Sequence, residues 1–119
     1  MEPEDTVTLS NLIESLSSAE RKKYPVYSGV FGYFRDAIFR LARVSYDGNE
    51  KHNPGEPLHW SRGKSSDHMD CAARHTLAYG SGDDDVTEEH LANNAWRSLA
   101  ELQLFLEKKY HITPPPSAG

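Results

Sequence analysis

The sequence predicts an all-α fold, a small bundle of three main helices with a short helix before them. Residues 30–46, 65–79 and 87–109 each repeat apolar side chains at helical spacing, and glycines and prolines separate these segments. A chain of 119 residues supports one modest core, and chains of this size often associate to bury more apolar surface. We therefore expect one domain that is completed by homo-oligomerisation.

Charge and composition exclude several classes of protein. A net charge of -5 argues against a protein whose main task is binding a nucleic-acid polymer. No apolar run approaches the length that spans a bilayer, and the acidic N-terminus lacks the features of a secretory signal. Cys71 is the only cysteine, so no intramolecular disulfide can form. We expect a cytoplasmic protein without a membrane partner, in the host-cell cytoplasm if it is phage-encoded.

The chain divides into three predicted parts. Residues 1–24 form an acidic arm with a short helix capped by Ser10, residues 25–109 form the helical domain, and residues 110–119 form an extended, proline-rich tail. The helix over residues 30–46 gathers apolar side chains on one side. Its predicted core face consists of Phe34, Ala37, Ile38 and Leu41.

Residues 47–63 are rich in glycine, asparagine and proline and are therefore predicted to form a loop. The loop carries donors, cations and an aromatic ring, which suit a phosphorylated ligand with a stacked base. The alternative is a polar surface loop whose tryptophan fills the core. The candidate substrate-binding residues in and next to this loop are Lys51, His52, Asn53, Trp60, Arg62 and Lys64.

The helix over residues 65–79 is predicted to start with Ser65 or Ser66 as its N-cap, where free amides attract an anion. Asp67, Asp70 and Arg74 share one face of this helix. Two carboxylates three residues apart can reach one hard cation, and aspartate suits Mg²⁺ or Mn²⁺. The alternative is an ordinary surface ion pair between Asp70 and Arg74.

The helix over residues 87–109 begins at a plausible N-cap, Thr87, and presents two stripes. We expect the polar stripe to meet the face that carries Asp67, Asp70 and Arg74. The second half of the helix is apolar almost all round, which favours a subunit interface. The predicted core stripe is Leu91, Ala95, Leu99, Leu102 and Leu106, and the polar stripe is His90, Asn94, Arg97 and Glu101.

Three segments, residues 36–53, 60–75 and 90–103, together resemble the phage and bacterial family of dATP/dGTP diphosphohydrolases. The most specific pieces are Lys51-His52-Asn53, Asp70 with Arg74-His75, and His90 with Asn94. This family is related to the all-α nucleotide pyrophosphohydrolases of the MazG type. The resemblance implies that a divalent metal supports cleavage of a purine (deoxy)nucleoside triphosphate to the monophosphate and pyrophosphate.

The sequence departs from that pattern at the metal site. MazG-type enzymes hold metal with paired acids on two neighbouring helices, whereas here the second helix offers Glu88 and Glu89 and then a histidine. We predict Asp67, Asp70 and Glu89 as metal ligands. The predicted catalytic residues are His75 and His90, and Arg74, Asn94 and Arg97 complete the predicted substrate site.

Because the carboxylates are few, a non-catalytic nucleotide-binding protein is the alternative function. Such a protein would act as a phage-type sponge that sequesters a purine nucleotide or a cyclic dinucleotide signal. A third possibility is a helical oligomer whose polar stripes are only networks of ion pairs.

Overall fold

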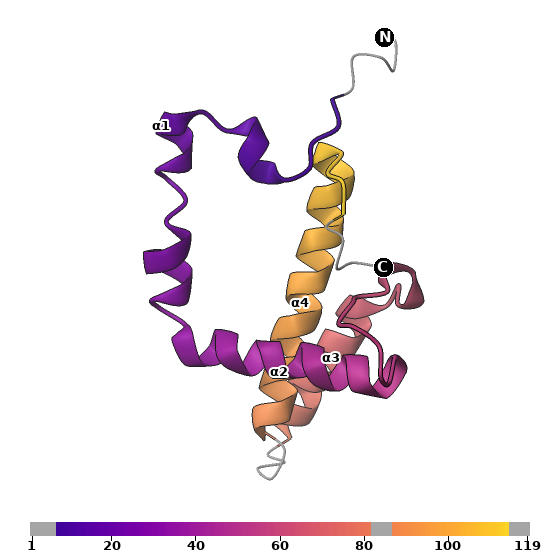
Figure 1. Cartoon of the computed structure of the whole chain (residues 1–119). Helices are drawn as coiled ribbons and strands as arrows, with labels where there is room; N and C mark the ends of the chain where they lie inside the picture. The colour runs from indigo at the N-terminus through magenta and orange to yellow at the C-terminus, as the bar shows by residue number, and fades with distance from the viewer. Residues whose placement is uncertain (1–6, 82–86, 115–119) are drawn as a thin grey trace.

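The computed structural model describes residues 7–81 and 87–114, which form helices joined by short connections (Figure 1). No strand occurs in these residues, where a single isolated bridge joins Leu9 to Ile112. The all-α class and the three main helices are therefore confirmed. The helices are η2 (Leu12–Ser15), α1 (Ser18–Arg21), η3 (Tyr27–Phe31), α2 (Arg35–His52), η4 (Arg62–Lys64), α3 (His68–Gly80) and α4 (Thr87–Tyr110).

The body of the molecule consists of α2, α3 and α4. The most extensive contact joins α3 to α4, and α2 crosses α4 and packs on it (Figure 1). The buried apolar side chains include Ala72 on α3 and Ala92 and Ala100 on α4. Small side chains let helices approach closely but bury little apolar area, so the core of one chain is thin.

The helix predicted over residues 30–46 starts and ends later in the structure, as α2. Residues 27–31 form a separate π-helical turn, η3, and Phe34 has the non-helical angles φ -122° and ψ 39° before α2 begins. Residues 47–52 belong to α2, so the prediction that the loop starts at Asp47 is wrong. The cost of a mid-helix glycine, about 1 kcal/mol at Gly48, is outweighed by tertiary contacts of the next residue, Asn49, which is buried.

Two predicted helix starts are also wrong. α3 begins at His68 with Asp67 at the N-cap position, and neither Ser65 nor Ser66 caps it. The single N-terminal helix expected after Ser10 is two short turns, because Asn11 caps η2 and the side chain of Ser17 caps α1. The predicted N-terminus of α4 at Thr87 agrees with the structure.

The largest difference concerns the face of α4 that is buried. In the predicted core stripe, Leu91, Leu99 and Leu102 are 48%, 52% and 52% exposed. The polar stripe faces α3 instead, with His90, Asn94 and Arg97 half-buried. The core prediction therefore fails for one chain, because polar side chains on α3 pair with the polar side chains of α4.

No described helix combines the length and apolar character needed to cross a membrane. The acidic start at residues 1–6, residues 82–86 between α3 and α4, and the end of the proline-rich tail lie outside the described residues.

Candidate functional site

A pair of histidines joins α3 to α4. The Nδ1 atoms of His75 and His90 are 3.0 Å apart, and both rings are half-buried. Because two ring nitrogens at this distance share one hydrogen, one imidazole donates and the other accepts. Burial lowers the pKa of His75, and the nearby charges of His90, Arg97 and Arg74 lower it further. His75 is therefore neutral at neutral pH and can accept a proton.

The polar contact between α3 and α4 continues on both sides of this pair, and we call the whole line the polar seam. The Asn94 side-chain amide donates to the Thr76 hydroxyl, and the Arg97 Nη1 atom lies 3.0 Å from the His68 Nδ1 atom. Three of the four α4 residues of the predicted polar stripe, His90, Asn94 and Arg97, thus contact α3, whereas Glu101 is exposed. The α3 residues of the polar seam are His68, His75 and Thr76, whereas the face with Asp67, Asp70 and Arg74 is exposed.

His68 is the most deeply buried ring of the polar seam, at 2% exposed. Since a guanidinium only donates, the Nδ1 atom accepts from Arg97 and the hydrogen of the neutral ring is on Nε2. Burial first, and then the Arg97 charge, lower the pKa of His68. The ring lies edge-on to Trp60 and tilted to Trp96, with centroids 6.3 and 6.1 Å away. His68, Trp60 and Trp96 form an aromatic cluster that supports the polar seam.

Trp60 and Arg62, both predicted to bind substrate, are occupied inside the chain. The Arg62 guanidinium lies 4.2 Å over the Trp60 ring and forms two hydrogen bonds to the Glu107 carboxylate, of 3.0 and 2.6 Å. Gln103 donates a third hydrogen bond to this carboxylate. These bonds, chiefly those from Arg62, lower the pKa of Glu107. Both residues therefore fix the loop to α4. This favours the alternative prediction for the loop, a polar surface segment in which Trp60 fills the core.

Asn49 organises the loop that follows α2. Its Nδ2 atom donates to the Glu56 carbonyl, and its Oδ1 atom accepts from the Asn53 side chain and from the His59 backbone amide. Asn53, which was predicted to contact substrate, is itself 8% exposed and serves this network. The spacing of two asparagines four residues apart at the end of α2 is the signal that could have revealed the network in the sequence.

The predicted metal ligands do not gather into one cluster. Asp67 lies 3.8 Å from the Arg74 guanidinium, while Asp70 and Glu89 are exposed. In the described parts of the chain, no three histidine, cysteine, aspartate or glutamate side chains are placed to hold a metal ion. These residues do not fit a metal cage made of protein ligands alone. An ion held by one or two carboxylates and by substrate phosphates is the arrangement they allow.

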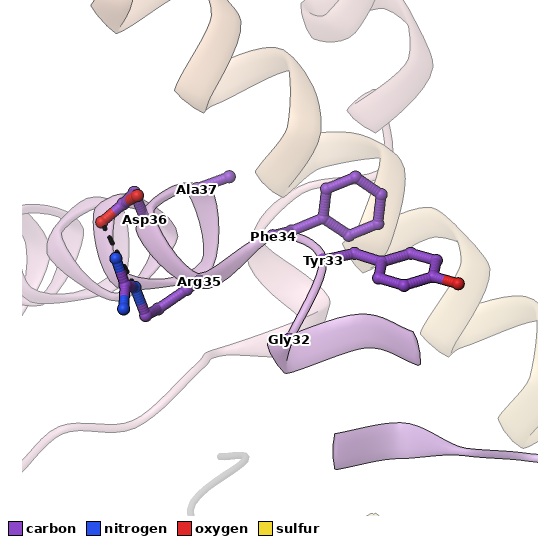
Figure 2. A pocket seen from close by; sticks show the side chains of 6 residues that line it. All are labelled: Gly32, Tyr33, Phe34, Arg35, Asp36 and Ala37. Atoms are coloured by element: carbon purple, nitrogen blue, oxygen red, sulfur yellow. Dashed lines mark ion pairs between the residues drawn. The ribbon is translucent and has the colours of Figure 1, made fainter. Parts of the chain in front are cut away.

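The remaining predicted residues are peripheral. Lys51 and His52 are exposed at the end of α2, and the Lys64 side chain lies outside what the structure describes. A separate hollow of about 280 Å³ at the start of α2 contains none of the predicted site residues (Figure 2). In that hollow the rings of Tyr33 and Phe34 point away from the Arg35–Asp36 ion pair.

The fold and the polar seam together define a small all-α protein in which two helices join through histidine, asparagine and arginine side chains. Residues 16–112 match the family described as dATP/dGTP diphosphohydrolase, N-terminal, and the chain belongs to this family. No curated protein matches the chain, and no solved structure matches it.

Sequence reasoning missed two residues that hold the site together. Glu107 reads as a charge at the exposed end of α4, yet it is 9% exposed and anchors the loop. His68 reads as a flanking residue of α3, yet it is the centre of the aromatic cluster. Neither position is distinguishable by helical spacing alone, because the partners Arg62 and Arg97 are far away in the sequence.

Proposed function

We propose that this protein hydrolyses a purine (deoxy)nucleoside triphosphate to the monophosphate and pyrophosphate. The family match supports the substrate class. The observation that carries the chemistry is the His75–His90 pair, in which a neutral imidazole with a lowered pKa lies next to a second imidazole. A general base with these properties activates water at neutral pH.

In the proposed reaction, His75 or His90 takes a proton from water while the water oxygen bonds to the α-phosphorus. The bond from that phosphorus to the bridging oxygen breaks, and the bridging oxygen leaves with pyrophosphate. The proton held by the imidazole pair then passes to solvent or to the product. The shared hydrogen between the two Nδ1 atoms keeps the rings in place for this transfer.

Cations of the chain would neutralise the triphosphate. Arg74 is exposed one position before His75 on α3, and Lys51 is exposed at the end of α2. Arg97 lies in the polar seam, where it also contributes to the low pKa of His75. Guanidinium groups pair with phosphate oxygens through two parallel hydrogen bonds, which orients the chain of phosphates as well as binding it.

Asp67 and Asp70 would hold Mg²⁺ or Mn²⁺ together with substrate phosphates, with Glu89 as the third predicted ligand. The bound ion would stabilise negative charge on the phosphates. Asp70 is exposed on the same helix as His75. This arrangement agrees with a site that receives its ion along with the nucleotide, since Mg²⁺ usually keeps few protein ligands.

The test is incubation of the full chain with dATP, dGTP and pyrimidine controls, with Mn²⁺, Mg²⁺ or EDTA, read by chromatography. We expect pyrophosphate release that EDTA stops. His90→Phe should lower the rate by about 10² to 10⁴, and Asp70→Asn should abolish turnover while helicity is retained. Asp36→Asn, which changes an exposed aspartate on α2, is the matched control. Undiminished hydrolysis by Asp70→Asn would sink the metal assignment.

A second candidate is nucleotide binding without turnover, as in a sponge for a purine nucleotide or a cyclic dinucleotide. The observation in its favour is that no three potential ligands cluster in the described residues. The same incubation separates the two functions when cyclic dinucleotides are added to the panel. Ligand recovered intact after the protein is denatured supports the sponge, and pyrophosphate release supports the enzyme.

A further inference from the structure

The guanidinium of Arg97 is held at one end and open at the other. Its Nη1 atom lies 3.0 Å from the His68 Nδ1 atom, and its other nitrogens bond to none of the described residues. Those nitrogens are not among the buried atoms that lack a partner, so solvent reaches them. The charge of Arg97 also lowers the pKa of His75, which places the guanidinium near the histidine pair. A guanidinium in this position offers its open N–H groups to phosphate oxygens.

His68 holds this guanidinium without cancelling its charge. A guanidinium only donates hydrogen bonds, so the Nδ1 atom of His68 accepts, and only a neutral imidazole can do so. Elsewhere in the chain a carboxylate takes the same place, as Glu107 does for Arg62. A carboxylate neutralises its cationic partner, whereas a neutral acceptor leaves the full positive charge for a ligand.

Two tryptophans keep the His68 ring in place. Its centroid lies 6.3 Å from that of Trp60 and 6.1 Å from that of Trp96, and the residue is 2% exposed. Trp96 is itself tied to α2, because its Nε1 atom donates a hydrogen bond of 2.9 Å to the Ser45 hydroxyl. A ring with this many neighbours cannot turn freely, so its hydrogen bond to Arg97 has a defined direction.

The second ring nitrogen of His68 indicates that the residue does more than fill space. The Nε2 atom is buried and has no hydrogen-bond partner among the described residues. A buried donor without an acceptor destabilises the fold, and an apolar side chain of similar size would avoid that loss. The bond between Nδ1 and Arg97 is therefore what distinguishes a histidine from such a side chain at this position.

We propose that His68 is a positioning residue, which holds the Arg97 guanidinium through a neutral hydrogen bond so that its open N–H groups meet the phosphates of the nucleotide. This role rests on the proposed function, because it requires a phosphorylated ligand at the polar seam, but it does not require hydrolysis. An arginine that is fixed before the ligand arrives loses less conformational entropy on binding. Loss of His68 should therefore weaken nucleotide binding rather than slow the chemical step.

The experiment is calorimetric titration of the full chain with the α,β-methylene analogues of dATP and dGTP in Mg²⁺, which bind without being cleaved. Arg97→Gln should raise the Kd by about 10- to 100-fold, as expected for the loss of a charge-assisted hydrogen bond. His68→Leu should raise it by about tenfold in the wild-type background and should add nothing in the Arg97→Gln background. The matched control is His59→Leu, at a loop histidine whose ring contacts the Pro57 carbonyl, and it should leave the Kd unchanged.

Two further variants separate the charge from the hydrogen bond. The Oδ1 atom of asparagine is as many bonds from Cα as the Nδ1 atom of histidine, so His68→Asn should keep the Kd within about threefold of the wild type. His68→Asp offers the same geometry but neutralises the guanidinium, so it should raise the Kd by about tenfold. Circular dichroism shows whether each variant keeps its helices. If His68→Leu loses them, the comparison of His68→Asn with His68→Asp decides.

The outcomes for His68 and for hydrolysis are distinguishable. Additive losses in the double variant, or equal Kd values for His68→Asn and His68→Asp, would overturn the positioning role, as would a wild-type chain that binds neither analogue. Pyrophosphate release from dATP and dGTP is measured separately. A wild-type chain that binds the analogues with the expected pattern but releases no pyrophosphate would contradict the hydrolysis and support the role of His68.

Discussion

Single residues carry most of the specificity of this fold, and many of them are polar. His68, Glu107 and Asn49 are among the most buried side chains described. The partners of His68 and Glu107 are distant in sequence, whereas those of Asn49 lie in the loop that follows α2. A buried polar group is costly without its hydrogen bonds, so each of these residues tolerates few alternative packings. His68 thereby makes the α3–α4 contact specific, and Glu107 and Asn49 do the same for the loop after α2, although the apolar core is small.

We predict that the free energy of unfolding falls as the pH drops below about 6.5. Burial lowers the pKa of His68 and of His75 from this ordinary value. In that acidic range the unfolded chain binds more protons than the folded chain, so protonation favours unfolding. Urea denaturation at a series of pH values measures the effect. His68→Phe should flatten the slope, whereas His52→Gln, at an exposed histidine, should leave it unchanged.

We also predict that removing one member of the Arg62–Glu107 pair is costly. The two side chains are 13% and 9% exposed, so Glu107→Leu leaves a guanidinium uncompensated and should cost about 3 kcal/mol. The double variant Arg62→Met, Glu107→Leu should recover much of that loss. Chemical denaturation gives the values. Arg43→Met breaks the exposed pair with Asp47 and should leave the midpoint near that of the wild type.

At the scale of elements, the helices of the body follow the sequence pattern, but their ends do not. α2 passes through Gly48 to His52 because Asn49 is fixed by three hydrogen bonds to the loop behind it. α3 starts after two serines that could have capped it. Local preferences of a few tenths to about 1 kcal/mol are easily overruled by tertiary contacts of this kind.

We predict that Asn49→Ala loosens this loop and lowers the free energy of unfolding by about 1 to 3 kcal/mol. The side chain is 7% exposed, so its removal leaves the Glu56 carbonyl and the His59 amide without a partner. Unfolding in urea measures the change, and hydrogen exchange at residues 53–59 should rise with it. Asn93→Ala removes only a bond to the Glu89 carbonyl within α4. Equal effects for the two variants would contradict the role of Asn49.

At the scale of the whole molecule, the buried and exposed faces of α4 are largely the reverse of those that its helical periodicity predicts. On α4, His90, Asn94 and Arg97 lie against α3, whereas Leu91, Leu99 and Leu102 are exposed. Apolar residues at helical spacing predict that one face of a helix is buried, but they do not identify the element that packs on it. Among the residues that the structure describes, nothing covers Leu91, Leu99 and Leu102, which stay about half exposed.

By itself the sequence determined the all-α class, the position of three main helices, and the family to which residues 16–112 belong. These features follow from the spacing of apolar residues and from short motifs, both of which can be read directly from one sequence. Only the tertiary structure decided that His75 meets His90, and that Trp60 and Arg62 are occupied inside the chain. It also decided that Asp67, Asp70 and Glu89 form no three-ligand metal cluster among the described residues. Such pairings join residues far apart in sequence, and their free energies depend on burial, which helical periodicity does not specify.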